Sequence, residues 1–400
     1  MRVMLVSPFL PYPPVAGGHR QAWTWLTHLA QDHPVAFVGF HEREAEAANT
    51  GEVSRHCAVA RIRLRQPTPH AYCSVAQAPR WVSEFYSEEL AQDIREVAAE
   101  FRPEVVQFLH TNMGQYRSCV DGAATVMTAL EVAFVAHRRR IAATGGVERL
   151  QARLEWLRML RHETALFRQA DHVIAVSEHD AGIVRAVAGH SRVTAVPPGV
   201  EREQLAPRPR DPERGRVLYL GHMEHLPNLE GLIHLYRDIW PAVRAAAPGS
   251  RLTIAGGGTQ EQMGRVAPDA LAAMQRDPSL EIAGFVPDLR ALMDRCVALA
   301  APLRLGSGVR NKVIEAMAAG LPVVTTSLGA EGLAVEHERE LLIADGATRF
   351  AGELVRVLKD EGLQHRLSEA GRALVARDHD NERLTKRLEH ALMRAIGEHA

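Results

Sequence analysis

The sequence has few lysines, few aromatic residues and no excess of charge of one sign. Of its 400 residues, 47 are Lys or Arg, 48 are Asp or Glu and 5% are aromatic, and the formal net charge is −1. A chain without a cationic excess lacks the electrostatic attraction that dominates binding to nucleic acid, so we expect no nucleic-acid partner. An apolar fraction of 46% with 24% charged residues predicts a globular protein. This length favours two domains.

Cysteines and long apolar runs are also scarce. The four cysteines lie far apart and form no CxxC pair, which gives no zinc motif and predicts reduced thiols. They are Cys57, Cys73, Cys119 and Cys296. No run approaches the roughly 18 apolar residues of a membrane-spanning helix. The N-terminus lacks the basic region and cleavage site of a signal peptide. We therefore expect a cytoplasmic protein without a bound metal.

Short β-branched runs alternate with longer segments of helical periodicity along the whole chain. This alternation predicts βαβ units and an α/β fold with parallel sheets. The expected strands are Val3–Val6, Val35–Phe40, Val105–Leu109, Thr125–Thr128, Val173–Val176, Val217–Leu220, Leu252–Ala255, Glu281–Ala283, Val297–Ala301, Val323–Thr325 and Leu341–Ile343. The Pro- and Arg-rich stretch from Val196 to Arg216 lacks periodicity and is interpreted as a linker. The two halves are therefore predicted to be doubly wound domains, with ligands beyond the carboxyl ends of their strands.

The most unusual stretch is RLGSGVRNKVIEAMAAGLPVV, which runs from Arg304 to Val324. Its Gly306 and Gly308 leave the backbone bare after a buried strand. A helix is expected from about Arg310 to Ala319, and Gly320 followed by Leu-Pro is typical of its end.

Two cations and one carboxylate lie in the first turns of this helix. The helix dipole and the free N–H groups at a helix start favour anions, so Arg310 and Lys312 predict contacts to a diphosphate. Glu315 follows Lys312 by three residues on the same face and suits the paired hydroxyls of a ribose. One helical turn can thus hold the phosphate and the sugar of a nucleotide. The alternative is an ordinary ion pair on a solvated helix.

Other glycine loops that follow strands are weaker candidates. Gly17 and Gly18 end a proline-stiffened loop before a helix. In the second half, Gly221 follows a strand and precedes His222, and Gly256 opens a run of three glycines. Each loop is consistent with a phosphate or a flat ring close to the backbone, or with a simple turn without a ligand.

Together these stretches resemble the family 4 glycosyltransferases. The resemblance rests on SPFLPYPPVAGGHR, VIAVSEHDA, VPPGV, LGHMEHLPNLEG, GFVPDLR and PLRLGSGVRNKVIEAMAAGLPVVTTSLGAEGL, which span nearly the whole chain. It implies the GT-B fold, with two Rossmann-like domains facing across a cleft. These would be an acceptor domain at residues 1–196, with a C-terminal helix at 377–400 packing back on it, and a donor domain at 197–376. Family members transfer a sugar from a nucleotide-diphosphate donor, with retention of configuration and without a metal or other cofactor.

The resemblance also implies residue roles. Lys312 would bind the diphosphate and stabilise the leaving phosphate, assisted by Arg310, and Glu315 would accept the ribose hydroxyls. The backbone of Val286 would lie near the base. The full set of donor-binding candidates is Gly17, Gly18, Gly221, His222, Gly256, Val286, Arg304, Gly306, Ser307, Gly308, Lys312 and Glu315.

The sequence departs from the family pattern in both halves. Ser307 replaces a glutamate that contacts the donor sugar, His222 stands where a basic residue is common, and the loop LPNLEG lacks a lysine. These changes occur together in a subgroup with the pattern PLRxGSGxRxKxxEA, and they leave the donor's identity open. Alternatives are a sugar-nucleotide epimerase, a phosphorylase or a non-catalytic GT-B partner subunit.

In the first half, Leu130 occupies the position of a histidine that family members place near the reaction centre. The neighbouring Glu131, or His110 at the end of a strand, are the catalytic candidates in its place, and His137 is a weaker one. Acceptor contacts are expected in the loops Arg43–Arg55 and Thr68–Ser87.

The segment His137–Ala170 carries eight arginines against three glutamates, with Leu150, Leu154 and Leu157 on one helical face. It is either a solvated helix or a contact to an anionic surface of the inner membrane. The acceptor can accordingly be a glycan, a lipid-linked sugar or a small molecule. The sequence does not indicate an oligomeric state.

Overall fold

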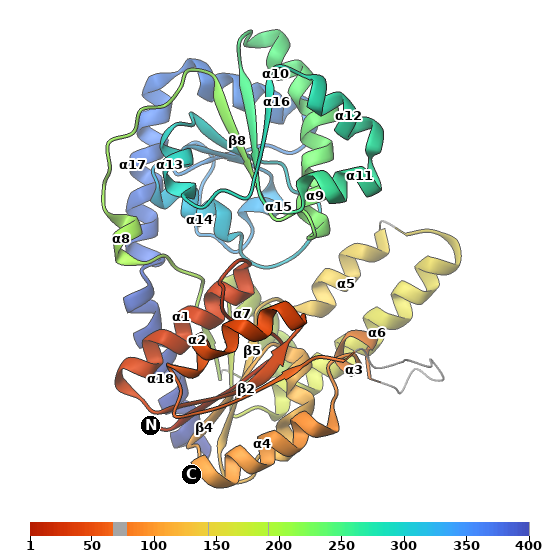
Figure 1. Cartoon of the computed structure of the whole chain (residues 1–400), viewed down its shortest axis with the longest axis vertical. Coiled ribbons are helices and arrows are strands. Elements are labelled where there is room, and N and C mark those ends of the chain that lie inside the picture. Colours follow the sequence, from red (N-terminus) through yellow and green to blue (C-terminus); the bar gives the residue numbers. More distant parts are fainter. Residues whose placement is uncertain (67–77, 143, 191, 400) are drawn as a thin grey trace. The chain divides into compact units, whose positions relative to one another are not determined.

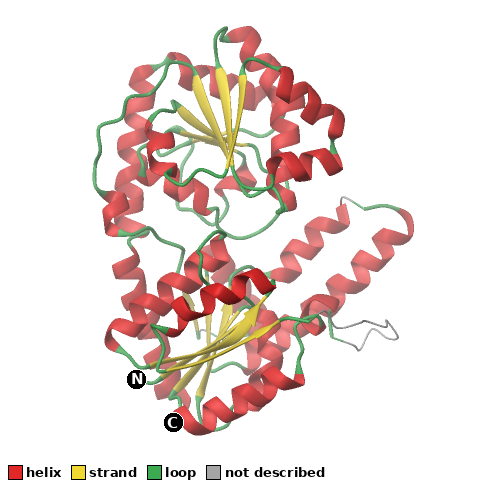
Figure 2. Ribbon diagram, viewed as in Figure 1, coloured by secondary structure: helices red, strands yellow, loops and turns green. Residues whose placement is uncertain are grey.

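The computed structural model describes residues 1–66, 78–142, 144–190 and 192–399. The chain divides into two compact units, residues 1–198 with 382–400 (unit 1) and residues 199–381 (unit 2). Each unit has one parallel sheet covered by helices, as the colouring by secondary structure shows (Figure 2). The prediction of two Rossmann-like doubly wound domains is confirmed. Cys73 and the first part of the predicted acceptor loop, Thr68–Gln77, lie outside the described residues.

The sheet of unit 1 has the strand order β3-β2-β1-β4-β5-β6-β7 (Figure 1). Its strands are β1 (Val3–Ser7), β2 (Val35–His41), β3 (Val59–Leu64), β4 (Val105–Leu109), β5 (Ala124–Ala129), β6 (His172–Ala175) and β7 (Val193–Ala195). All neighbours pair in parallel. The strand order reverses between β1 and β4, so the loops after these two strands leave the sheet at its switch point.

The helices of unit 1 are α1 (Gly17–Asp32), η1 (Glu44–Asn49), α2 (Thr50–Ser54), α3 (Arg80–Ser83), α4 (Glu88–Phe101), η2 (Thr111–Cys119), α5 (Ala133–Ala142), α6 (Gly146–Gln169), α7 (Glu178–Ala188) and α18 (Asn381–His399). The last of these starts at Asn381 rather than near residue 377. Its Leu388, Leu392 and Ala395 are fully buried in one cluster with Leu5 of β1. This apolar contact holds the C-terminal helix in unit 1.

The sheet of unit 2 has the order β10-β9-β8-β11-β12-β13, again all parallel. Its strands are β8 (Arg216–Leu220), β9 (Arg251–Ala255), β10 (Leu280–Gly284), β11 (Ala298–Ala301), β12 (Val323–Thr325) and β13 (Leu342–Ile343). Its helices are α8 (Arg202–Leu205), α9 (Leu226–His234), the π-helical turn η3 (Leu235–Ile239), α10 (Trp240–Ala246), α11 (Thr259–Val266), α12 (Pro268–Arg276), α13 (Leu289–Asp294), α14 (Asn311–Ala318), α15 (Ser327–Ala330), α16 (Ala347–Lys359) and α17 (Glu361–Asp378). The switch point lies between β8 and β11.

The predicted strands all form, and the sequence missed two more, β3 and β7. Both are edge strands, which bury less surface than central ones. The sequence of β3, VARIRL, contains two arginines and none of its residues is fully buried. β7 is three residues long. Neither strand therefore shows the continuous apolar run that marks the central strands.

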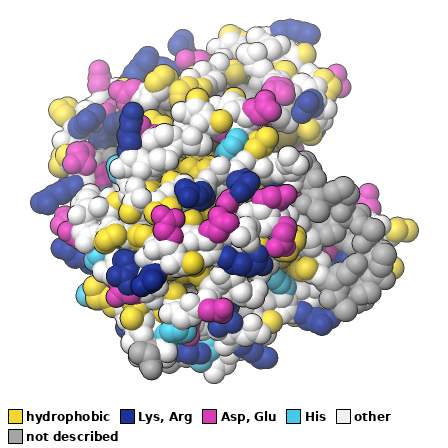
Figure 3. All heavy atoms as spheres, turned by 60° about the horizontal axis from the view of Figure 1, so that its bottom comes forward, with side chains coloured by type: hydrophobic (Ala, Val, Ile, Leu, Met, Phe, Trp, Pro, Cys, Tyr) yellow, Lys and Arg dark blue, Asp and Glu magenta, His cyan; other side chains and the backbone are white. Residues whose placement is uncertain are grey.

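The described surface is mixed in charge. Figure 3 shows one face on which cationic and anionic side chains are interspersed. No helix among the described residues is both long and apolar enough to cross a bilayer. The described cysteines Cys57, Cys119 and Cys296 are free thiols.

Candidate functional site

The candidate site of unit 2 lies at the switch point of its sheet. β8 and β11 are neighbours, with Ala298 paired to Val217, so the loops that follow them leave the sheet side by side. The first loop begins at Gly221, and the second passes through Gly306 and Gly308 to α14. Ligands of doubly wound sheets bind at such positions, where helix N-termini point outward.

Lys312 connects the two loops. From the first turn of α14, its ammonium donates to the main-chain oxygen of Leu220 at 2.6 Å and to Oδ1 of Asn228 at 2.7 Å. It also lies 5.4 Å from the centre of the Tyr219 ring, within cation–π range. These three partners are neutral. Burial, with a smaller contribution from Arg310, lowers the pKa of Lys312 to about 7. A buried cation held by neutral groups would gain strongly from a bound anion.

Arg310 packs against the glycine loop that precedes α14. It is buried, and its Nη1 donates to the main-chain oxygen of Ser307 at 2.9 Å. Gly306 lies against the same guanidinium, because a Cβ there would be 3.1 Å from Nη2 of Arg310. Gly308 has a positive φ of 75°. The predicted helix is confirmed, since α14 spans Asn311–Ala318 and directly follows this loop.

The other candidates of unit 2 have different surroundings. Glu315 follows Lys312 by one turn of α14 and is partly exposed. Arg304 is an ion-pair partner of Glu230, with Nε 2.7 Å from Oε1, so its charge is already balanced in part. Val286 lies in the loop between β10 and α13 and packs against the core of unit 2.

Gly256 is required by backbone packing. Its φ is +141°, and a Cβ would lie 1.8 Å from the main-chain oxygen of Gly221. Only glycine permits this conformation and this approach. The loops after β8 and β9 are also joined by a hydrogen bond of 3.0 Å from the amide of Met223 to the oxygen of Gly257. The partly exposed ring of His222, in the loop after β8, lies against Gly257 in the loop after β9.

In unit 1, the structure brings the loops after β1 and β5 together. Gly17 and Gly18 are the first two residues of α1, whereas the sequence predicted them to end the loop just before this helix. A Cβ on Gly18 would lie 3.4 Å from the ring of Phe9 and 3.5 Å from Leu130. Gly18 therefore lies beside Leu130, and Glu131 follows Leu130 directly in the chain.

His110 leaves β4 at the same edge of the sheet of unit 1. Its φ is +111°, a strained conformation for a residue other than glycine. Its Nδ1 accepts a hydrogen bond from the amide of Thr111 at 3.1 Å, and its ring contacts Trp81 edge-on at 4.6 Å. Burial lowers the pKa of His110 to about 4, so the imidazole is neutral near pH 7.

Sequence reasoning missed Glu163, a fully buried residue of α6. Its carboxylate accepts from Thr111 Oγ1 at 2.8 Å and from the amide of Phe134 at 2.9 Å. Glu163 thereby connects the start of η2, next to His110, to the start of α5, which follows Glu131. Burial raises the pKa of Glu163 to about 7 against these hydrogen bonds. The sequence contained a signal for this burial, because the residues on the same face of α6 are apolar. These residues are Met159, Leu166 and Phe167.

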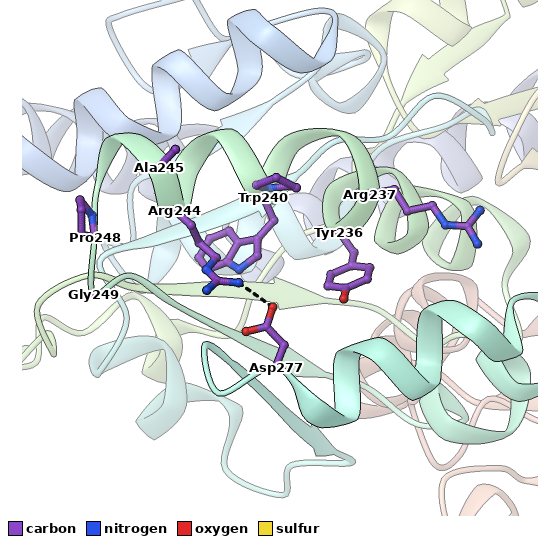
Figure 4. Close-up of a pocket in the computed structure, with 9 residues that line it drawn as sticks. Tyr236, Arg237, Trp240, Arg244, Ala245, Pro248, Gly249 and Asp277 are labelled. Carbon is purple, nitrogen blue, oxygen red and sulfur yellow. Dashed lines mark hydrogen bonds and ion pairs between the residues drawn. The ribbon is translucent and has the colours of Figure 1, made fainter.

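A separate hollow of about 680 Å³ lies elsewhere on unit 2 (Figure 4). Its lining comprises Tyr236, Arg237, Trp240, Pro241, Arg244, Ala245, Pro248, Gly249 and Asp277. Arg244 and Asp277 bond to each other at 2.8 Å, and Trp240 donates to Ser279 at 3.1 Å. Gly249 and Asp277 precede β9 and β10, so this hollow is at the amino ends of the strands, opposite the candidate site.

The comparisons with known proteins concern both the second unit and the whole fold. Residues 214–360 match the family model described as Glycosyl transferases group 1. The chain is 31% identical over 150 residues to an uncharacterized 44.6 kDa protein in the cps region of Klebsiella pneumoniae, covering 36% of this chain and 37% of that protein. It is 27% identical over 262 residues to D-inositol 3-phosphate glycosyltransferase of Salinispora tropica, covering 59% of this chain and 54% of that protein. The chain thus spans between 37% and 54% of the length of these curated relatives.

Among solved structures, HepE of Anabaena in complex with UDP-glucose superposes with a TM-score of 0.70 at 14% identity, over 98% of this chain and 99% of that one. This likeness shows the fold. The fold is the GT-B type expected from the sequence, built of two Rossmann-like parallel-sheet domains.

Proposed function

We propose that the protein is a family 4 glycosyltransferase that moves a sugar from a nucleoside-diphosphate donor to an acceptor hydroxyl with retention of configuration. The observation that carries this proposal is Lys312, a buried ammonium at the switch point of unit 2 that is held by neutral acceptors. Support also comes from the family model over residues 214–360, and from the fold shared with a protein that binds UDP-glucose.

The proposed chemistry uses the charges around α14. When the bond from C1 of the sugar to the β-phosphate oxygen breaks, negative charge grows on the phosphate. Lys312, Arg310 and the N-terminal end of α14 oppose this charge, and such preorganised groups supply the largest part of many rate enhancements. The acceptor oxygen bonds to C1 on the same face, and its proton passes to the departing phosphate. Because these cations balance the diphosphate, we propose that turnover needs no metal and survives EDTA.

The remaining residues take supporting parts in the proposal. Glu315 accepts hydrogen bonds from the ribose hydroxyls, and the glycine loops before α14 border the transferred sugar. Unit 1 supplies the acceptor contacts. There, His110 stays neutral down to about pH 4 and offers a hydrogen bond to the acceptor rather than a charge. Glu131 is the second candidate of this unit.

We propose in addition that the enzyme contacts an anionic membrane surface through the beginning of α6. α5 and α6 pack together and project from the rest of unit 1 (Figure 1). Val147 and Leu150 are 73% and 59% exposed, and the neighbouring Arg149 and Arg153 are also exposed. Exposed apolar side chains beside two arginines, with Glu148 as the single exposed anion between Val147 and Arg153, suit the interface of a bilayer with anionic lipid.

Flotation with phosphatidylcholine vesicles, with and without phosphatidylglycerol, tests this contact. We expect binding only to the anionic vesicles, and loss of binding in Val147→Asp/Leu150→Asp. Val266→Asp, a matched change at an apolar residue of α11 that is 59% exposed, should bind as the wild type does. Equal flotation of both variants would show that the beginning of α6 is only a solvated surface.

A thermal-shift panel of nucleoside diphosphates and their sugars tests the central proposal. A donor bound at 100 times its Kd stabilises the folded protein by about 2.7 kcal/mol, which is a readily measured rise in Tm. Slow hydrolysis of that donor without an acceptor is expected of a transferase. Release of a new sugar nucleotide would instead indicate an epimerase. A panel without any shift would contradict the proposed function.

A further inference from the structure

Asn228, at the start of α9, makes hydrogen bonds through both its side-chain amide and its main chain within the candidate site. Its Oδ1 accepts from the ammonium of Lys312 at 2.7 Å, and its Nδ2 donates to the main-chain oxygen of His222 at 3.0 Å. Its own amide donates to the oxygen of His225 at 2.9 Å. The hydroxyl of Tyr219 donates to its main-chain oxygen. Both the position and the orientation of the side-chain amide are thus fixed, with the oxygen directed at Lys312.

The backbone leaves room for this side chain. A Cβ on Gly221 would lie 2.6 Å from Cγ of Asn228, closer than real atoms approach. Gly221 therefore has a structural purpose, because any larger residue there would push the amide away from Lys312. The loop after β8 and the first turn of α9 are built around one partly buried amide, that of Asn228.

The chemistry of an amide explains why this residue suits the site. Asn228 and the oxygen of Leu220 orient the ammonium through two hydrogen bonds, but neither cancels its charge. A carboxylate at the same place would pair with Lys312 and compete with a bound anion. A residue without an acceptor would leave the ammonium with fewer hydrogen bonds and favour its neutral form.

We propose that Asn228 is a positioning residue that holds the ammonium of Lys312 toward the donor diphosphate while leaving its charge available. This inference rests on the proposed function. The titratable and charged groups around the cluster are Tyr219 on β8, His222, Glu224 and His225 in the following loop, Glu230 on α9, and Arg310 before α14.

The test is the pH dependence of nucleoside-diphosphate binding in variants at this position, measured by calorimetry with the diphosphate that gives the largest thermal shift. In the wild type, affinity should fall as the pH rises above about 7, where Lys312 loses its proton. Asn228→Asp should move this fall to higher pH by roughly one unit or more, and weaken binding at pH 7 by about 10-fold. Asn228→Ala should move the fall in affinity to lower pH, because the ammonium loses a hydrogen-bond acceptor.

Two further variants separate positioning from general damage. Gly221→Ala keeps the amide but displaces it, so it should shift the pH profile in the direction of Asn228→Ala. Gln275→Glu makes the same amide-to-carboxylate change at an exposed residue of α12 and should leave the profile unchanged. Circular dichroism and Tm show whether each variant is folded.

The outcomes distinguish the two proposals. If the wild type binds no nucleoside diphosphate, the proposed function itself fails. If the wild type binds but the folded variants at positions 228 and 221 share its pH midpoint, Asn228 has no positioning role and only this inference is overturned. Opposite shifts for Asp and Ala would support it, because a merely structural residue would not move the midpoint in both directions.

Discussion

Lys312→Met should remove a pH dependence from the stability of the ligand-free protein and abolish most of the activity proposed above. The pKa of the ammonium is lowered from 10.5 to about 7, chiefly by burial. At about 1.4 kcal/mol for each tenfold change in the ionisation constant, this is on the order of 5 kcal/mol. The ammonium is enclosed by its partners but the side chain as a whole is partly exposed, so solvent screening reduces this penalty to a few kcal/mol. Methionine keeps the apolar stem of lysine and removes the charge.

The sign follows from proton linkage. Between about pH 7 and 10.5 the unfolded chain keeps the proton on Lys312 and the folded chain releases it, so wild-type stability rises with pH in this window. Below pH 7 both states are protonated and the wild type carries the full penalty. Methionine has no such dependence, but it leaves two acceptors without their donor, at about 1–3 kcal/mol each. The free energy of unfolding of the variant relative to that of the wild type should therefore be highest near pH 6 and fall by a few kcal/mol toward pH 10.

Denaturant unfolding of both proteins from pH 6 to 10 measures this difference directly. Lys359→Met, at an exposed residue of α16, is the matched control and should show no pH-dependent difference. In the same preparations, turnover by Lys312→Met should fall by roughly 10²–10³, the scale for losing one preorganised donor. A stability difference that stays constant across the pH range would refute the account of a buried charge. Near-normal turnover would refute the role of Lys312 in the reaction.

Two further predictions concern the groups that support the sites. Glu163 has a pKa raised from 4.5 to about 7, so the wild type should lose stability relative to Glu163→Gln as the pH rises from about 4.5 to 7. Melting temperatures across that range check this, and parallel curves would show that the carboxyl group is not buried in solution. Gly256→Ala should destabilise unit 2 by more than about 2 kcal/mol, because its Cβ would collide with the oxygen of Gly221 at a positive φ. Gly352→Ala, on the exposed side of α16 with no atom nearby, should instead be neutral or stabilising by up to about 1 kcal/mol. Equal effects of the two alanines in chemical denaturation would contradict the packing described for the glycine loops.

The contact of Lys312 with the loop after β8 is one that the sequence alone did not predict. The loop LPNLEG contains no lysine and offers the acceptor Asn228 to the ammonium. α14 supplies the cation that lies against this loop.

The sequence by itself determined the parts of this protein that depend on neighbouring residues. β-branched runs define the central strands, and the glycines with Leu-Pro fix the start and end of α14, because backbone conformation and helix periodicity are local properties. The tertiary structure alone decided which distant groups meet. Lys312 reaches Leu220 and Asn228, which lie 92 and 84 residues earlier, because β8 and β11 pair in the sheet. Glu163 is buried because the loops after β4 and β5 converge on α6. Sequence patterns do not encode such contacts directly, since burial and hydrogen bonding across the fold depend on how all the elements pack together.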